Sequence, residues 1–118
     1  MSNNVKEQDI QKACIDYLKL RGIFCYKINN VGVKKPNGSY IPAQTKGIPD
    51  LVLHYKGHVH YIEFKAPKGK MSEHQELFQD QCMNDGINYM VIRSVDELVK
   101  ELNNEFMGLT WYDWIYNT

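Results

Sequence analysis

Two apolar runs joined by a two-residue turn are the feature that most constrains this chain. Residues 50–55 (DLVLHY) and 58–65 (HVHYIEFK) are rich in residues that favour β-strands, and Lys56-Gly57 lies between them. Two-residue loops that contain glycine are the commonest connections of β-hairpins. The sequence therefore predicts an antiparallel hairpin over residues 50–65.

The register of this hairpin decides where its charged side chains lie. If Tyr55 faces His58 across the turn, pairing outward brings Asp50 opposite Glu63, and opposed Cβ atoms are roughly 4.5–5.5 Å apart. Lys65 lies two residues beyond Glu63 and therefore points to the same face. Opposed like charges destabilise a sheet, and a shared cation removes that penalty. Two acids and an amine brought together indicate a divalent metal site beside a lysine, which is the minimum equipment for cutting a phosphodiester.

An ordinary surface hairpin with an ion pair is the alternative interpretation. The D…ExK spacing alone favours it, because charged residues mostly lie on solvated faces. The surroundings of Glu63 favour the metal site, because this acid is embedded in the apolar run 61–64 (YIEF).

Three histidines lie on the same hairpin. The predicted register places His58 and His60 on the face opposite Glu63, and His54 on the face of Asp50. They cannot all bind one ion, and we interpret His58 and His60 as ordinary hairpin residues.

Charge is distributed unevenly along the chain although its net charge is zero. Residues 19–70 contain ten Lys or Arg and two acids, which are Asp50 and Glu63. Residues 71–118 contain nine acids and two Lys or Arg. Such a middle segment can form a phosphate-facing surface around a metal site, if blocks in the sequence become patches in space.

Length and composition predict one domain spanning residues 1–118. The chain has no run of about 20 apolar residues that could span a membrane, and its first twelve residues are polar, without a signal-peptide hydrophobic region. Three widely spaced cysteines are typical of reduced thiols in a cytoplasmic protein. Without a CxxC pair or a glycine-rich phosphate loop, neither a structural zinc nor a nucleotide cofactor is expected.

The remaining elements follow from periodicity and capping signals. The predicted order is helix, strand, long loop, hairpin, helix, strand and helix, an α/β pattern with a mixed central sheet. The first predicted helix covers 4–21, is capped by Asn3 or Asn4 and is ended by Gly22, and a strand over 23–28 follows it. A second helix is predicted from Ser72 to Gly86, where Gln75 completes a capping box with Ser72. A strand over 88–92 and a last helix after Ser94 follow, and Glu97 completes a second capping box with Ser94.

Glu7 extends the apolar stripe of the first helix by one turn. An acid at a helix N-terminus is favoured by the helix macrodipole. It could equally be a carboxylate aimed at the metal site, and helical spacing leaves these two readings even.

Residues 29–46 have no clear period and are predicted to be a long loop with a short β excursion at 39–41. Long loops without regular structure are often functional, and a mobile surface loop is the other interpretation. The candidate DNA-contacting residues are Lys34, Lys35, Tyr40 and Lys46 in this segment, with Lys68 and Lys70 after the hairpin.

Residues 105–118 form an extension rich in aromatic residues. Such a segment is expected to pack on the body or to form a subunit interface, and stacking on single-stranded nucleic acid is a further option. Its aromatic residues are Phe106, Trp111, Tyr112, Trp114 and Tyr116.

Taken together, these motifs resemble the virus-type replication-repair nuclease (VRR-NUC) domain, a branch of the PD-(D/E)xK nucleases. The resemblance covers about residues 4 to 100 and rests on Glu7, on 47–51 (GIPDL), on 62–66 (IEFKA), and on 70–72 (KMS) with Gln75. It implies a restriction-endonuclease-like α-β-β-β-α-β core, with a mixed central sheet flanked by helices, and metal-dependent cleavage of DNA. The aromatic extension falls outside the pattern.

The resemblance also implies a role for each matching residue. It makes Asp50 and Glu63 the metal-binding acids, with the main-chain carbonyl of Phe64 as a further ligand, and Lys65 the catalytic lysine. It makes Glu7 the acid of the first helix, which favours the functional reading of that residue. Gln75 is expected to position Lys65 or the substrate.

Oxygen ligands favour a hard cation such as Mg²⁺ or Mn²⁺ over Zn²⁺. The resemblance implies a structure-selective endonuclease of replication, recombination or repair, similar to Holliday-junction resolvases. It would be a homodimer acting on branched DNA in the cytosol of a bacterium, or of a host cell if phage-encoded. The alternatives are a non-catalytic DNA-binding or assembly module that keeps the fold, and an RNA-directed nuclease.

Overall fold

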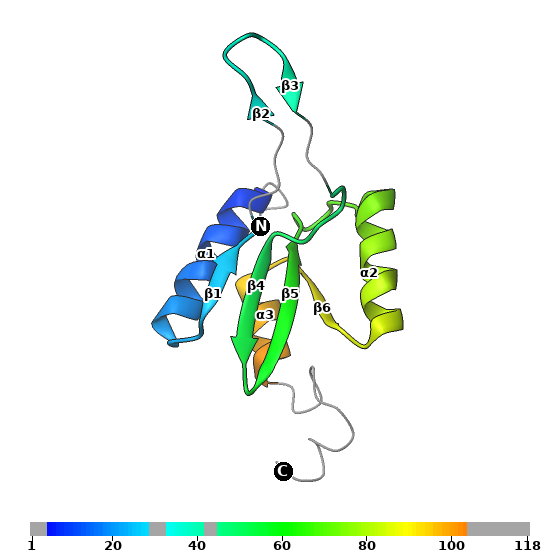
Figure 1. Cartoon of the computed structure of the whole chain (residues 1–118). Helices are drawn as coiled ribbons and strands as arrows, with labels where there is room; N and C mark the ends of the chain where they lie inside the picture. Colours follow the sequence, from blue (N-terminus) through cyan, green and yellow to red (C-terminus); the bar gives the residue numbers. More distant parts are fainter. Residues whose placement is uncertain (1–4, 29–32, 42–44, 104–118) are drawn as a thin grey trace.

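The structure is a computed structural model that describes residues 5–28, 33–41 and 45–103. Three helices and six strands follow one another along these residues (Figure 1). In chain order they are α1 (Glu7–Leu20), β1 (Cys25–Lys27), β2 (Val33–Lys34), β3 (Tyr40–Ile41), β4 (Leu51–Tyr55), β5 (His58–Phe64), α2 (Glu73–Asp85), β6 (Asn88–Ile92) and α3 (Val95–Asn103).

Four strands form the central sheet in the order β1-β4-β5-β6. The first three are antiparallel neighbours, whereas β6 runs parallel to β5 after the crossover through α2. The sheet is therefore mixed, as predicted, and its elements with α1 and α2 form the α-β-β-β-α-β core. The short pair β2–β3 and the helix α3 are additions to that core.

The hairpin has the predicted register. Tyr55 pairs with His58, and Leu51 pairs with Ile62 at the other end of β4. Lys56 and Gly57 have φ values of 51° and 80°, as a type I′ turn requires, and this turn matches the twist of the flanking strands. Asp50 lies directly before β4, and its N–H donates to the carbonyl of Ile62 at 3.0 Å.

The two faces of the sheet are covered by different helices. Helices α1 and α3 pack on one face, and α2 packs on the other, where Phe78 contacts the rings of Tyr61 and Tyr89 (Figure 1). The face toward α1 and α3 forms the hydrophobic core. Its fully buried members include Leu18, Leu51, Leu53, Ile62, Phe64, Ile92, Leu98 and Leu102.

The first helix and strand differ in their limits from the prediction. Helix α1 begins at Glu7, with Lys6 at the N-cap and no side-chain capping bond, so the helix predicted from residue 4 is too long. The predicted caps Asn3 and Asn4 lie outside the described residues. The helix ends at Leu20 with Arg21 at the C-cap, and the predicted stop residue Gly22 follows with a φ of 70°, which lets the chain turn back. The strand predicted over 23–28 is limited to Cys25–Lys27.

The capping boxes of the later helices are present to different extents. In α2 the box of Ser72 and Gln75 is complete, and Gly86 ends the helix with a φ of 72°. In α3 the Ser94 hydroxyl accepts from the N–H of Glu97 at 3.1 Å. The Glu97 carboxylate accepts from the N–H of Arg93 instead of Ser94, so only half of the second predicted box forms.

The segment predicted as a long loop contains a short hairpin. Strands β2 and β3 pair through Lys34 and Tyr40, so the expected β excursion has a partner strand. Figure 1 places this hairpin beyond the end of the sheet at which α1 and α2 begin. The aromatic extension predicted over 105–118 lies outside the described residues. In the part of the chain that the structure describes, no helix is long and apolar enough to cross a membrane.

Candidate active site

Three acids from different elements converge at the open end of the hairpin. Glu7 is the first residue of α1, Asp50 precedes β4, and Glu63 is the penultimate residue of β5. One carboxylate oxygen from each lies within 4.8 Å of the others. The sequence register predicted the pairing of Asp50 with Glu63, the resemblance added Glu7, and the fold brings the three acids together.

Glu63 is the most buried of the three acids, with 1% of its surface exposed. Its Oε2 accepts a hydrogen bond from Gln75 Nε2 at 2.9 Å. Its Oε1 is buried and accepts no hydrogen bond from any residue that the structure describes. Burial, and next the negative charge of Asp50, raise the pKa of Glu63 to about 8. The free site therefore retains a proton that a cation would displace.

Asp50 is fixed by the strand that carries Glu63. The N–H of Phe64 donates to Asp50 Oδ2 at 2.8 Å, which holds this carboxylate at the end of the hairpin. Glu7 completes the group, and burial raises the pKa of its carboxyl, while Lys65 opposes that change.

Lys65 brings a positive charge into the same site. Its side chain is 11% exposed, and its Nζ lies 3.9 Å from Glu63 Oε2. The N–H of Lys65 donates to the carbonyl of Ile92, so the backbone that carries the amine continues the pairing of β5 with β6. The predicted set of two acids and a lysine on one face is therefore assembled.

Gln75 links the second helix to the acids. Its Oε1 accepts from the N–H of Ser72 at 2.9 Å as part of the capping box, while its Nε2 donates to Glu63. The resemblance implies that Gln75 positions Lys65 or the substrate; in this structure its side chain hydrogen-bonds to Ser72 and to Glu63.

The donor set of this site fits a hard divalent cation. Octahedral Mg²⁺ binds oxygen at about 2.0–2.1 Å, so opposite ligand atoms are about 4.2 Å apart, close to the spread of the three carboxylates. The buried Glu63 Oε1 is an acceptor with no protein donor, as a metal ligand would be. The predicted further ligand is the carbonyl of Phe64, whose side chain is fully buried in the core.

The predicted DNA-contacting residues are all exposed. Lys34, Lys35 and Tyr40 belong to the β2–β3 hairpin, beyond the site end of the sheet. Lys46 lines a hollow of about 250 Å³ together with Gln75. Lys68 and Lys70 follow β5 in the loop after Lys65.

Two structural residues of the site escaped sequence reasoning. Gly47 has a φ of 78°, and a Cβ built on it would lie 2.2 Å from the carbonyl oxygen of His74, so the loop before Asp50 touches the start of α2. Arg93 Nη1 donates to the carbonyls of Ala66 and Gly69 at 2.8 and 2.6 Å. The glycine at the start of the run 47–51 could have indicated the close contact with His74, whereas no sequence pattern indicates the hydrogen bonds of Arg93.

Two buried polar groups were also missed. His60 is 1% exposed on the core face, and its Nδ1 has no hydrogen-bond partner among the described residues. It is therefore a buried residue of the hairpin, on the face that packs against the core. The Tyr89 hydroxyl on the other face is likewise buried without such a partner. Burial and the charge of Glu63 raise the pKa of this phenol.

A mixed sheet flanked by helices, with acids and a lysine at the open end of its central hairpin, is the arrangement expected of a nuclease core. Residues 5–96 match the VRR-NUC domain, and the chain belongs to this family. Membership supports a nuclease-type function in DNA processing, with DNA as the substrate. Searches of curated proteins and of solved structures found no match.

Proposed function

We propose that this protein is a DNA endonuclease that hydrolyses phosphodiester bonds with Mg²⁺ or Mn²⁺ held by Glu7, Asp50 and Glu63. The observation that carries the proposal is the Glu63 carboxylate, buried beside two other acids with one oxygen that no described residue satisfies. Ionising a carboxyl in such a position costs free energy unless a positive charge compensates it. A bound cation supplies the missing partner.

The groups around the acids have different roles in this proposal. When bound, the cation polarises a phosphoryl oxygen and lowers the pKa of its water. The Phe64 N–H and the Gln75 amide hold Asp50 and Glu63 in place. The Lys65 ammonium, 3.9 Å from Glu63, orients the attacking water or stabilises the negative charge that develops on the phosphate.

The finer assignment is a homodimeric, structure-selective enzyme similar to Holliday-junction resolvases. Support comes from the family resemblance and from the exposed lysines of the β2–β3 hairpin and the loop after β5, which flank the site end of the sheet. Two copies would present two such sites to the two strands that must be cut in a four-way junction. In this proposal the whole chain is one nuclease domain with an aromatic extension.

The test is a cleavage panel of four-way junction, flap, single-stranded and duplex DNA with Mg²⁺ or Mn²⁺. We expect metal-dependent products, fastest on branched DNA. Asp50→Asn and Lys65→Met should each reduce the rate by about 100-fold or more, by analogy with the loss of one charge-stabilising group in other active sites. Asp80→Asn and Lys100→Ala, which alter exposed residues away from the site, should cut at the wild-type rate.

The other outcomes distinguish the alternatives. DNA binding that is unaffected by a chelator, without products on any substrate, would identify a non-catalytic binding module. Faster cleavage of matched RNA than of DNA would identify an RNA-directed nuclease. Wild-type rates in Asp50→Asn would overturn the assignment of the acids.

A further inference from the structure

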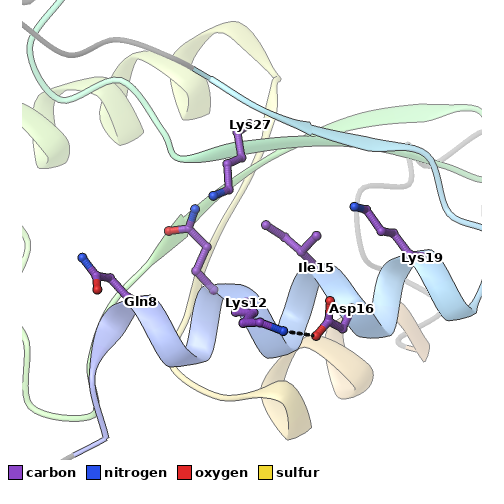
Figure 2. A pocket seen from close by; sticks show the side chains of 7 residues that line it. Gln8, Lys12, Ile15, Asp16, Lys19 and Lys27 are labelled. Carbon is purple, nitrogen blue, oxygen red and sulfur yellow. Dashed lines mark hydrogen bonds and ion pairs between the residues drawn. The ribbon is translucent and has the colours of Figure 1, made fainter.

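A groove of about 530 Å³ runs between α1 and the edge strand β1, outside the acid site (Figure 2). Ile15, which packs against the core, lies on its α1 side. The other lining residues are polar or charged, namely Gln8, Gln11, Lys12, Asp16, Lys19 and Lys27. The lining therefore presents amides and cations around a small apolar surface.

The positive charge of the groove is only partly neutralised. Lys12 pairs with Asp16 at 2.9 Å, so these two charges largely cancel. Lys19 and Lys27 form no ion pair with any carboxylate in the described part of the chain. Figure 2 shows them pointing from α1 and from β1 into the space between the two elements. An anion in the groove would thus meet one uncompensated lysine from each side.

One end of the groove lies near the acid site, because Gln8, which lines it, directly follows Glu7. Glu7, Gln11, Ile15 and Lys19 follow one another every fourth residue, so they form one ridge along α1. On the other side, Lys27 pairs with Leu51, the residue directly after Asp50. The ridge extends about 18 Å from Glu7 to Lys19 at 1.5 Å per residue. That length corresponds to about five base pairs of duplex at 3.4 Å each.

We infer that the groove between α1 and β1 binds the phosphate backbone of one nucleic-acid strand as it leaves the acid site. The ligand class is a phosphodiester chain, held by Lys27 near the acids and by Lys19 about five nucleotides away, with Gln8 and Gln11 donating to phosphate or sugar oxygens between them. This inference rests on the proposed function, because the strand in the groove is the one presented to the acids. It adds a contact surface separate from the β2–β3 hairpin and the basic loops.

The experiment measures DNA affinity on the Lys65→Met background with Mn²⁺, by fluorescence anisotropy of labelled DNA at several salt concentrations. Lys19→Gln and Lys27→Gln should each weaken binding several-fold. Each should also reduce the slope of log affinity against log salt by about 0.7–0.9, the value of one lost phosphate contact. Lys56→Gln in the β4–β5 turn and Lys100→Gln on α3 are the matched controls and should change neither quantity.

Substrate length then tests the direction of the strand. Substrates carry arms of two to ten nucleotides on either side of the cleavage position. The loss caused by Lys19→Gln should appear only when one particular arm reaches about five nucleotides, whereas the loss caused by Lys27→Gln should already appear on a shorter arm. A loss that is independent of arm length, or equal to that of the controls, would overturn the inference.

The outcomes separate this inference from the proposed function. Metal-dependent cleavage with unchanged binding in both groove variants overturns the groove and leaves the nuclease intact. DNA binding that depends on the groove, without cleavage by the unmodified protein, supports the groove and overturns the nuclease. Failure of the unmodified protein both to bind and to cut DNA overturns both.

Discussion

Gln75 makes two hydrogen bonds with separate consequences. Its Oε1 caps α2 through the N–H of Ser72, and its Nε2 orients Glu63. Partners that orient a metal ligand typically contribute 10–100-fold to metal affinity or activity. Gln75→Glu keeps an acceptor for the cap but places a negative charge against Glu63. We expect Mn²⁺ affinity, measured by calorimetry, and the cleavage rate to fall at least about 10-fold.

Ser72→Ala is the matched control for that substitution. It removes the capping acceptor for the N–H of Gln75 and leaves the contact with Glu63 available. We expect a loss of about 1 kcal/mol in the free energy of unfolding, with little change in Mn²⁺ affinity. Equal effects of Ser72→Ala and Gln75→Glu on metal affinity would contradict the assignment of two separate roles.

His60 should make the stability of the fold sensitive to mild acid. Burial, and next the nearby His58, lower the pKa of His60 to about 4 in the folded protein, whereas an unfolded histidine titrates near 6.5. Between these values the unfolded chain binds more protons, so stability is full above about pH 6.5 and is lost as pH falls toward 4. At pH 5 the expected loss is about 2 kcal/mol relative to pH 7.5.

Denaturant unfolding at pH 7.5 and pH 5 checks this expectation. In His60→Leu and His60→Gln the titration of His60 is absent. The loss of unfolding free energy between pH 7.5 and pH 5 should therefore be smaller than in the wild type, and by the same amount in both variants. Comparison with the wild type cancels the contribution of every other titrating group to the pH dependence. The apolar replacement by Leu and the polar replacement by Gln distinguish an effect of protonation from an effect of packing. A pH dependence identical to that of the wild type would refute this account of His60.

At the scale of elements, the contact between the loop before β4 and the start of α2 sets the position of Asp50. Gly47 has the positive φ that disfavours side chains, and its Cα faces the backbone of His74 and Gln75. Gly47→Ala should therefore cost more than the ~1–2 kcal/mol of the left-handed conformation alone, because the loop or the helix must also move. We expect a large loss of both stability and metal affinity, measured by thermal unfolding with and without Mn²⁺.

Gly57→Ala is the control for this prediction. Gly57 has a similar φ of 80°, but nothing lies within 4 Å of a Cβ built there. Its substitution should cost only the conformational term and leave metal affinity unchanged. Equal losses in the two variants would show that the contact with α2 is unimportant.

Sequence reasoning reached those parts of the fold that local chemistry determines. Gly57 in a two-residue turn, together with the alternation of strand faces, is sufficient to pair Asp50 with Glu63. The capping box of Ser72 and Gln75 likewise predicts the start of α2. The support of the site by Arg93 was not predictable in this way. Its bonds join backbone carbonyls more than twenty residues away, and a side chain that binds carbonyls leaves no pattern in the sequence.

Glu7 and His60 mark the limit of pattern arguments. The helical stripe left the role of Glu7 open, and only the packing of α1 against the sheet brought its carboxylate to the other acids. The register assigned His60 to the face opposite Glu63 but gave no indication of its burial. Burial of a single polar residue depends on which helix covers it, and that is a tertiary property.

At the scale of the whole molecule, the basic segment of the sequence divides between several surfaces. Its lysines occur on the β2–β3 hairpin, in the loops beside the acids and on both sides of the α1–β1 groove. Lys56 instead lies in the turn at the other end of the hairpin. The acids of the later segment that the structure describes are carried by α2 and α3. The uneven charge of the sequence therefore makes the molecule asymmetric in charge, with most of its cations around the end of the sheet that carries the acid site.

Concentrating three acids at one end of the sheet should make metal binding and folding stability interdependent. Glu7, Asp50 and Glu63 disfavour one another in the metal-free fold, whereas a cation bound only by the folded protein stabilises it by about 2.7 kcal/mol at 100 times its Kd. For a domain of this size, Mn²⁺ should then raise Tm by roughly 10 °C.

Asp50→Asn retains an oxygen for the Phe64 N–H but removes one charge. We expect this variant to melt above the wild type in chelator and below it in saturating Mn²⁺, in thermal scans at pH 7.5. Asp80→Asn, remote from the site, should follow the wild type in both conditions. Curves that do not exchange order would contradict this account: a variant above the wild type in both conditions would show that Asp50 is not a ligand, and one below it in both would show that Asp50 is not repelled by its neighbours.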